Sequence, residues 1–128
     1  MISLITNDKV LKYFLHYEIE DAGVSVKVNE TLSSRDYVGI KVDDYYCSLK
    51  LDKTPKSVDF IITVDCQCNS YLLYILEFKK LKKPKYLKVQ EILEKITNTF
   101  NDFIEDRFKY IFLNDKYKYK KVFIYLVG

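Results

Sequence analysis

The sequence contains little arginine, and it has no long apolar run. Its only arginines are Arg35 and Arg107, whereas lysine is abundant. Because arginine is the usual residue for bidentate recognition of guanine, strong readout of base sequence in a nucleic acid is disfavoured. No apolar run approaches the roughly 18 residues of a membrane-spanning helix. Residues 1–18 mix charged with apolar side chains, unlike a signal peptide. We therefore expect a cytoplasmic protein with no membrane association.

Cysteine and histidine are also too few to build a common structural site. The three cysteines, Cys47, Cys66 and Cys68, are an odd number in a chain without an export signal, which argues against a disulfide framework. A structural zinc site needs four ligands. Cys66 and Cys68 lack such partners, because the only histidine, His16, is far away in the sequence. Free thiols are therefore expected.

What is present is a chain that can fold, with a concentrated positive charge. It has 128 residues, of which 48% are hydrophobic and 30% charged, and this predicts one domain over residues 1–128. The net charge is only +3, but lysines gather in two clusters. Such clusters attract polyanions such as nucleic acid, although a solvated lysine-rich surface is the alternative. The first cluster is Lys79, Lys80, Lys82, Lys83, Lys85 and Lys88, and the second is Lys116, Lys118, Lys120 and Lys121.

The hydrophobic periodicity predicts an α/β domain. Apolar residues at helical spacing predict a first helix over residues 7–21, with Asn7 as its N-cap and Gly23 as its stop, and a long amphipathic helix over residues 85–109. Dense β-branched and aromatic runs separated by a polar link predict a central hairpin of buried strands. The strands are expected at residues 24–28, 36–42, 45–51, 58–64, 71–78 and 122–127.

Three charged residues stand at one end of the predicted central hairpin. Asp59 lies at the start of its first strand, and Glu77 and Lys79 lie at the end of its second. Antiparallel pairing brings these two ends together, and the spacing of two puts Glu77 and Lys79 on the same face. Two carboxylates can hold Mg²⁺, and a lysine can orient or deprotonate an attacking water or neutralise developing charge. The pattern predicts a site for metal-assisted phosphodiester hydrolysis.

The segment from Asp59 through Phe60-Ile61-Ile62 to Glu77-Phe78-Lys79 resembles the signature of the PD-(D/E)xK nuclease superfamily. The resemblance implies a restriction-endonuclease-like core, with a central mixed β-sheet flanked by helices in the order α-β-β-β-α-β. It implies that Asp59 and Glu77 bind Mg²⁺ or Mn²⁺ and that Lys79 assists the attacking water. Many members carry a further acid on the first helix, for which Glu18 is preferred over Glu20. Some members carry a glutamine on the following helix, which corresponds to Gln90.

We therefore expect a metal-dependent endonuclease that acts on DNA, or less readily on RNA. Five lysines would hold the phosphate backbone: Lys80, Lys82, Lys83, Lys85 and Lys88. Specific protein–DNA interfaces often bury more than about 1,000 Å², so a homodimer or a separate recognition subunit is expected. Two alternatives remain open. One is a catalytically inactive module of this fold that binds nucleic acid or protein, and the other is an unrelated small α/β interaction protein.

Overall fold

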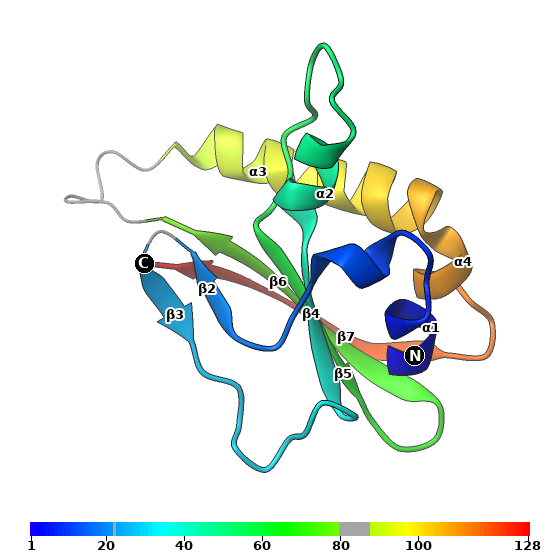
Figure 1. Ribbon diagram of the computed structural model, residues 1–128. Coiled ribbons are helices and arrows are strands. Elements are labelled where there is room, and N and C mark those ends of the chain that lie inside the picture. The colour runs from blue at the N-terminus through cyan, green and yellow to red at the C-terminus, as the bar shows by residue number, and fades with distance from the viewer. Residues whose placement is uncertain (22, 80–87) are drawn as a thin grey trace.

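A mixed five-stranded sheet forms the centre of the fold (Figure 1). The computed structural model describes residues 1–21, 23–79 and 88–128. The sheet has the strand order β1-β4-β5-β6-β7. Adjacent strands are antiparallel except for β6 and β7, which are parallel. These strands are β1 (Leu15–His16), β4 (Tyr37–Lys41), β5 (Phe60–Asp65), β6 (Ser70–Phe78) and β7 (Lys118–Val127). The predicted α/β class is confirmed.

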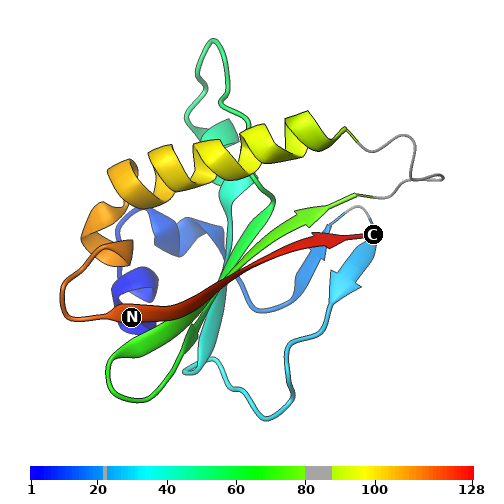
Figure 2. The same ribbon diagram turned by 180° about the vertical axis from the view of Figure 1, so that it is seen from behind.

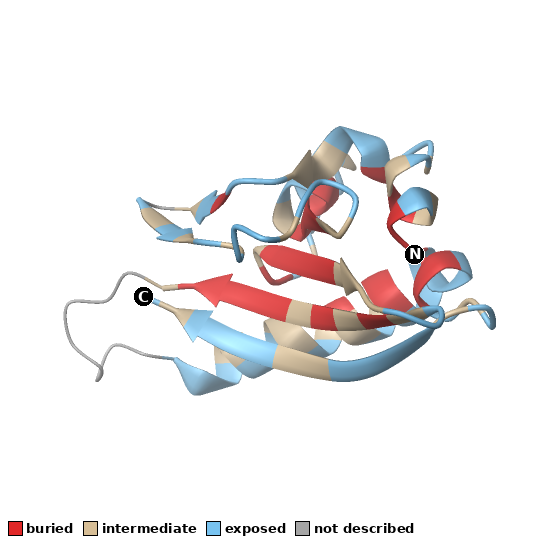
Figure 3. Cartoon of the chain, turned by 90° about the horizontal axis from the view of Figure 1, so that it is seen from below, coloured by how far each residue is buried: buried red, intermediate tan, exposed pale blue. Residues whose placement is uncertain are grey.

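The central hairpin of β5 and β6 forms as the sequence predicts. Its register runs from the pair Phe60–Leu76 to the pair Asp65–Tyr71. Cys68 and Asn69 make the turn with positive φ angles of 62° and 56°. Figure 3 shows that burial is concentrated in the central strands, whereas the edge strand β7 is largely exposed. Strands enclosed on both faces need apolar side chains at every position, which explains their near-continuous apolar sequences.

Two layers cover the two faces of this sheet (Figures 1 and 2). Helical residues pack against the face that carries Ile61 and Ile75, and together they form the larger of two hydrophobic cores. The smaller core packs the separate hairpin of β2 (Ile19–Asp21) and β3 (Val24–Val26) against the opposite face, which carries Phe60 and Leu76. The helical elements are α1 (Ile2–Thr6), the 3₁₀ helix η1 (Leu11–Phe14), α2 (Val42–Ser48), α3 (Val89–Asn98), the π-helix η3 (Thr99–Arg107) and α4 (Lys109–Phe112).

The long amphipathic helix predicted after the central hairpin is present. It begins as α3 at Val89, continues through the π-helix η3, and ends with α4. Phe103 and Ile104 are buried in the larger core, whereas Val89 and Leu93 near its start are exposed. The predicted first residues of this helix, 85–87, lie outside the described part of the chain.

The prediction of a first helix over residues 7–21 is wrong. Asn7 instead ends α1, and the chain then forms η1, β1 and β2. The Asp8 carboxylate accepts hydrogen bonds from the backbone N–H groups of Val10 and Leu11, at 3.0 and 2.9 Å. Gly23 has a φ of 77° and joins β2 to β3 rather than ending a helix. Residues 15–16 pair with β4, and β2 pairs with β3. This strand pairing outweighs the helical spacing of the apolar residues, which is only a local preference.

The strand predicted over residues 45–51 is also wrong, because most of this segment is the helix α2. Val42, Tyr45 and Tyr46 are buried together, and this spacing of three and four residues is helical. Asp43 lies in the first turn, where the helix dipole favours negative charge. An alternating pattern and a helical pattern overlap here, and packing against the larger core selects the helix.

The final strand is longer than predicted. β7 begins at Lys118 and pairs with the whole length of β6. Lys118, Lys120 and Lys121 are therefore exposed residues of an edge strand rather than of the preceding loop. Among the described residues, no helix combines the length and apolar character that crossing a membrane requires.

Candidate carboxylate site

Asp59 and Glu77 meet at the open end of the central hairpin. Asp59 directly precedes β5, one step beyond the Phe60–Leu76 pair, so it lies opposite Glu77. Residues directly opposite each other in antiparallel strands point to the same face. The carboxylate of Asp59 accepts a hydrogen bond from the backbone N–H of Phe78 at 2.8 Å, which holds its side chain against β6. The two acids therefore adjoin through the register of the hairpin.

Glu77 is buried and has cations from two elements beside it. Only 2% of the residue is exposed. Its Oε2 accepts a hydrogen bond from Lys95 of α3 at 2.6 Å, and the ammonium of Lys79 lies 4.0 Å from the same oxygen. Its Oε1 accepts no hydrogen bond from the residues that the structure describes, although a protonated Asp59 carboxyl beside Glu77 can donate to it. When Asp59 is ionised this buried oxygen lacks a donor, which is costly, and it is then available to a ligand.

Two further carboxylates join Asp59 from outside the hairpin. Asp21 at the end of β2 and Asp43 in the first turn of α2 each place one oxygen near Asp59, and the three oxygens lie within 4.8 Å of one another. We call Asp21, Asp43, Asp59 and Glu77 the carboxylate site. It therefore draws on both layers that cover the sheet.

Lys41 balances part of this negative charge. Its ammonium lies 3.3 Å from Asp43, 3.3 Å from Asp44 and 3.9 Å from Asp21. Burial lowers the pKa of Lys41, but the charges of Asp43, Asp44 and Asp21 together raise it above its ordinary value. Lys41 is therefore protonated, and it sits on the side of the site formed by β2 and α2.

Burial and the crowding of the carboxylates raise the pKa of two of them. Burial, followed by the adjacent Glu77 carboxyl, raises the pKa of Asp59 to about 7. Burial also raises the pKa of Asp43 to about 6; the neighbouring Asp59 adds to this effect and Lys41 opposes it. Both groups resist ionisation in the protein alone, because burial and neighbouring negative charge disfavour the charged form.

Asp21, Asp43 and Lys95 stand at the site although none of them was predicted from the sequence. Asp43 lies between the strands predicted at residues 36–42 and 45–51, and in the structure it stands in the first turn of α2. Lys95 lies on the predicted long helix and is separated from Glu77 by 18 positions. The helical spacing of Val42, Tyr45 and Tyr46 is the one signal that places Asp43 at a helix start. No local pattern marks Asp21 or Lys95.

The two glutamates predicted to supply a further acid from a first helix do not lie on a helix in the structure. Glu18 is exposed between β1 and β2, and Glu20 is exposed within β2, so neither lies on a helix. Successive strand residues point to opposite sides, which directs Glu20 away from the side of Asp21. This segment contributes Asp21 to the carboxylate site in place of the two predicted glutamates.

The remaining predicted residues lie at or beyond the start of α3. Gln90 is exposed in the first turn of α3, and Lys88 is exposed directly before it. The side chain of Lys79 is 27% exposed at the end of β6, and its backbone N–H donates to Val127 O at 2.7 Å. Four predicted phosphate-binding lysines lie outside the described residues: Lys80, Lys82, Lys83 and Lys85.

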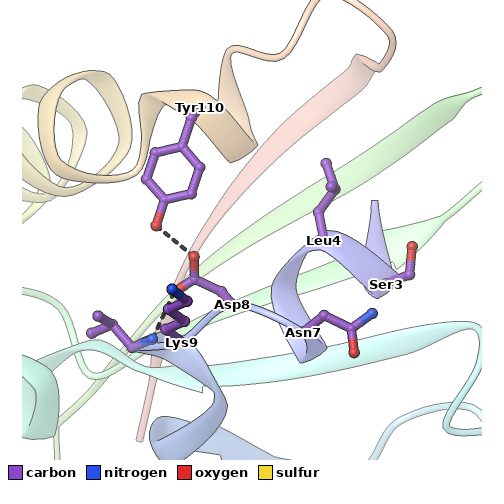
Figure 4. Close-up of a pocket in the computed structure, with 7 residues that line it drawn as sticks. Ser3, Leu4, Asn7, Asp8, Lys9 and Tyr110 are labelled. Carbon is purple, nitrogen blue, oxygen red and sulfur yellow. Dashed lines mark hydrogen bonds between the residues drawn. The ribbon is translucent and has the colours of Figure 1, made fainter.

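A separate pocket lies at the opposite end of the central strands (Figure 4). It is lined by residues of α1, the following turn and α4, including Asp8 and Tyr110. The hydroxyl of Tyr110 donates a hydrogen bond to Asp8 at 2.5 Å. The N-terminal amino group lies 3.8 Å from Asp65, the last residue of β5, whereas Asp59 precedes its first. This pocket is therefore not part of the carboxylate site.

The donor set of the carboxylate site fits a hard divalent cation. Mg²⁺ and Mn²⁺ favour carboxylate oxygens, and Mg²⁺ usually binds proteins through one or two carboxylates. The buried Oε1 of Glu77, without a donor among the described residues, is the observation that supports such a ligand. Asp59 and Glu77 would hold the ion, with Asp21 and Asp43 adjoining Asp59.

The chain matches no known protein family model, curated protein or solved structure. The chemistry of the carboxylate site and the order of the elements that carry it are therefore the indications of function.

Proposed function

We propose that this protein is a metal-dependent nuclease that hydrolyses phosphodiester bonds. The observation that carries the proposal is the buried Glu77, with one oxygen lacking a donor among the described residues, directly beside Asp59. Carboxylates gathered in this way disfavour each other's charge unless a cation is bound. Mg²⁺ or Mn²⁺ held by Asp59 and Glu77 would supply Lewis-acid activation of a water and stabilisation of charge on the phosphoryl group.

The order of elements supports a restriction-endonuclease-like core. β4, β5 and β6 are antiparallel neighbours in the sheet, with α2 inserted between β4 and β5, and they are followed by α3 and by a strand parallel to β6. Asp59 directly precedes the second of these strands, Glu77 lies at the end of the third, and Lys79 directly follows it. This is the arrangement that the resemblance to the PD-(D/E)xK superfamily implies for the strands, the following helix and the last strand.

The protein groups have separate tasks in the proposed reaction. Asp59 is held by the N–H of Phe78, so its second oxygen keeps a defined direction. The side chain of Lys79 is 27% exposed and so reaches solvent, and it would orient the attacking water or neutralise charge on the phosphodiester. The Thr99 hydroxyl, which accepts from Val58 N–H at 3.1 Å, fixes the residue that precedes Asp59.

The proposed substrate is DNA in preference to RNA. Lys88 stands directly before α3, and it would contact the phosphate backbone together with Lys80, Lys82, Lys83 and Lys85. Lysine contacts to phosphate give affinity that depends strongly on salt and little on sequence. A homodimer, or a separate subunit that recognises the substrate, would extend the small contact surface of one chain. We place this activity in the cytoplasm.

A catalytically inactive module that binds nucleic acid or protein is the second candidate. One observation favours it: Glu77 is already paired with Lys95 at 2.6 Å, as a purely structural ion pair would be. In that case the lysines after Lys79 would bind a polyanion without cleavage, and removal of Asp59 would leave that binding unchanged.

Cleavage assays on defined substrates test the proposal. Plasmid DNA, single-stranded DNA and RNA are incubated with Mg²⁺, Mn²⁺ or EDTA, using wild type, Asp59→Asn and Lys79→Met. Asp106→Asn is the matched control, because Asp106 is an exposed acid of η3. We expect metal-dependent cleavage of DNA that falls at least about a hundredfold in both site variants and is unchanged in the control. Absence of cleavage on every substrate would contradict the nuclease and favour the binding module.

A further inference from the structure

Lys95 contacts the carboxylate site more closely than Lys79 of the Glu77-Phe78-Lys79 motif does. Its ammonium donates to Glu77 Oε2 at 2.6 Å, whereas that of Lys79 lies 4.0 Å from the same atom. The side chain of Lys95 is 19% exposed and that of Lys79 is 27% exposed. The short contact is a charge-assisted hydrogen bond, and the longer one is an ion pair without a hydrogen bond.

The backbone of Lys95 is fixed to the segment that leads into Asp59. The Thr99 hydroxyl donates to the carbonyl of Lys95 at 2.7 Å and accepts from the N–H of Val58 at 3.1 Å. One turn of α3 is thereby held against the start of β5, and Asn98 adds a hydrogen bond to Lys56 O at 3.1 Å. Only the flexible side chain of Lys95 is left to move relative to Glu77.

The buried Glu77 carboxylate needs a positive partner when no divalent cation is present. Burial of an unpaired charge is strongly unfavourable, and Lys95 supplies the one hydrogen-bonded ammonium among the described residues. The other oxygen of Glu77 remains without a donor in this part of the chain, so a single ammonium does not satisfy the carboxylate. A divalent ion between Glu77 and Asp59 would compete with Lys95 for the same negative charge.

We propose that Lys95 is the built-in counter-ion of Glu77 in the metal-free protein and leaves Glu77 when a divalent cation is bound. Lys95 therefore sets the metal affinity of the carboxylate site, as a positioning residue that acts through Glu77. When released, its ammonium has another carboxylate within reach, since Glu91 lies four residues earlier on the same face of α3. This inference rests on the metal binding that the proposed function assumes.

The first test measures metal affinity by titration calorimetry with Mn²⁺ on the whole chain. Lys95→Met is compared with wild type and with Lys109→Met, which removes the same charge at an exposed position of α4. We expect Lys95→Met to bind Mn²⁺ about tenfold more tightly, because the competing ammonium is gone, and Lys109→Met to stay within about twofold of wild type. Equal or weaker binding by Lys95→Met would overturn the proposal.

The second test uses the unaltered protein and so does not depend on the folding of a variant. Reductive methylation of lysines is followed by mass spectrometry in EDTA and in Mn²⁺. We expect Lys95 to react more slowly than Lys109 in EDTA and to become faster when Mn²⁺ is added. A rate for Lys95 that does not change with Mn²⁺, in a protein that calorimetry shows to bind the ion, would overturn the displacement of Lys95.

The two tests separate this inference from the proposed function. If the wild type binds Mn²⁺ and Lys95→Met binds it no more tightly, the proposed role of Lys95 is wrong, but the metal site is still supported. Wild-type and Lys95→Met proteins that both fail to bind Mn²⁺ overturn the metal site, and the competition proposed for Lys95 falls with it.

Discussion

Asp59 accepts a hydrogen bond from the backbone N–H of Phe78 at 2.8 Å, and this bond ties the start of β5 to the end of β6. Glu77, the residue before Phe78, is 2% exposed. Burial, and after it the Glu77 carboxyl, raise the pKa of Asp59 to about 7. The sheet therefore holds two acids together although each disfavours the charge of the other. This relationship is the basis of the expected behaviour of the protein toward metal ions and pH.

Metal ions should stabilise the protein through Asp59. A ligand at one hundred times its dissociation constant stabilises the native state by about 2.7 kcal/mol, so saturating Mg²⁺ or Mn²⁺ should raise the melting temperature by several degrees relative to EDTA. Asp59→Asn keeps an acceptor for Phe78 N–H but removes the charge, so it should lose this shift. Differential scanning fluorimetry measures it. The prediction fails if Asp59→Asn and the exposed control Asp106→Asn respond equally to metal.

The metal-free protein should lose stability as the pH rises from about 4 to about 7. The pKa of Asp59 is about 7 in the folded protein, against 3.8 as its ordinary value, so the folded state binds the proton more tightly. Between these values the folded protein holds more protons than the unfolded chain, and raising the pH therefore favours unfolding. Because Asp59 is partly exposed, the effect should be on the order of 1 kcal/mol.

Urea denaturation in EDTA at several pH values between 4 and 8 measures this dependence. Asp59→Asn should flatten the curve, because the substituted residue does not titrate. Asp43, whose pKa is raised to about 6, should leave a smaller slope at lower pH in that variant. Stability that rises with pH over this window in wild type, and not in Asp59→Asn, would show that the pKa of Asp59 is lowered rather than raised.

Thr99→Val should destabilise the protein by about 1–3 kcal/mol, because it leaves a buried N–H without a partner. The Thr99 hydroxyl accepts from Val58 N–H at 3.1 Å, and both residues are buried. Thr97→Val is the matched control, since Thr97 is an exposed residue of α3. Chemical denaturation compares the two variants. Equal loss of stability in both would mean that helix propensity, and not the link to Val58, is responsible.

Gly39→Ala should destabilise the sheet by about 1–3 kcal/mol through overpacking. A Cβ at Gly39 would collide with the end of the Ile19 side chain and would lie 2.8 Å from His16 O. Ile19→Val in the same background should recover part of the loss, because it removes the colliding methyl group. Thermal melts of the single and double variants measure this coupling. Additive losses in the double variant would contradict the contact between Gly39 and Ile19.

The central hairpin and its two acids follow directly from the sequence. Two neighbouring apolar runs joined by a short turn can pair in few registers. Asp59 and Glu77 must adjoin once the register pairs Phe60 with Leu76. The long helix after them was equally predictable, because its apolar spacing extends over many turns. The secondary structure of shorter segments was less predictable. Residues 7–21 and 45–51 carry patterns that suit more than one structure, and packing against the sheet decided between them.

Local patterns of residues are enough to predict a mixed α/β chain with Asp59, Glu77 and Lys79 at one end of a hairpin. The presence of Asp21, Asp43 and Lys95 beside them depends on contacts between distant segments. These residues arrive from β2, α2 and α3, whose positions depend on how each element packs on the sheet and not on local spacing. Contacts between distant segments are settled by burial and shape, which no short pattern of residues encodes.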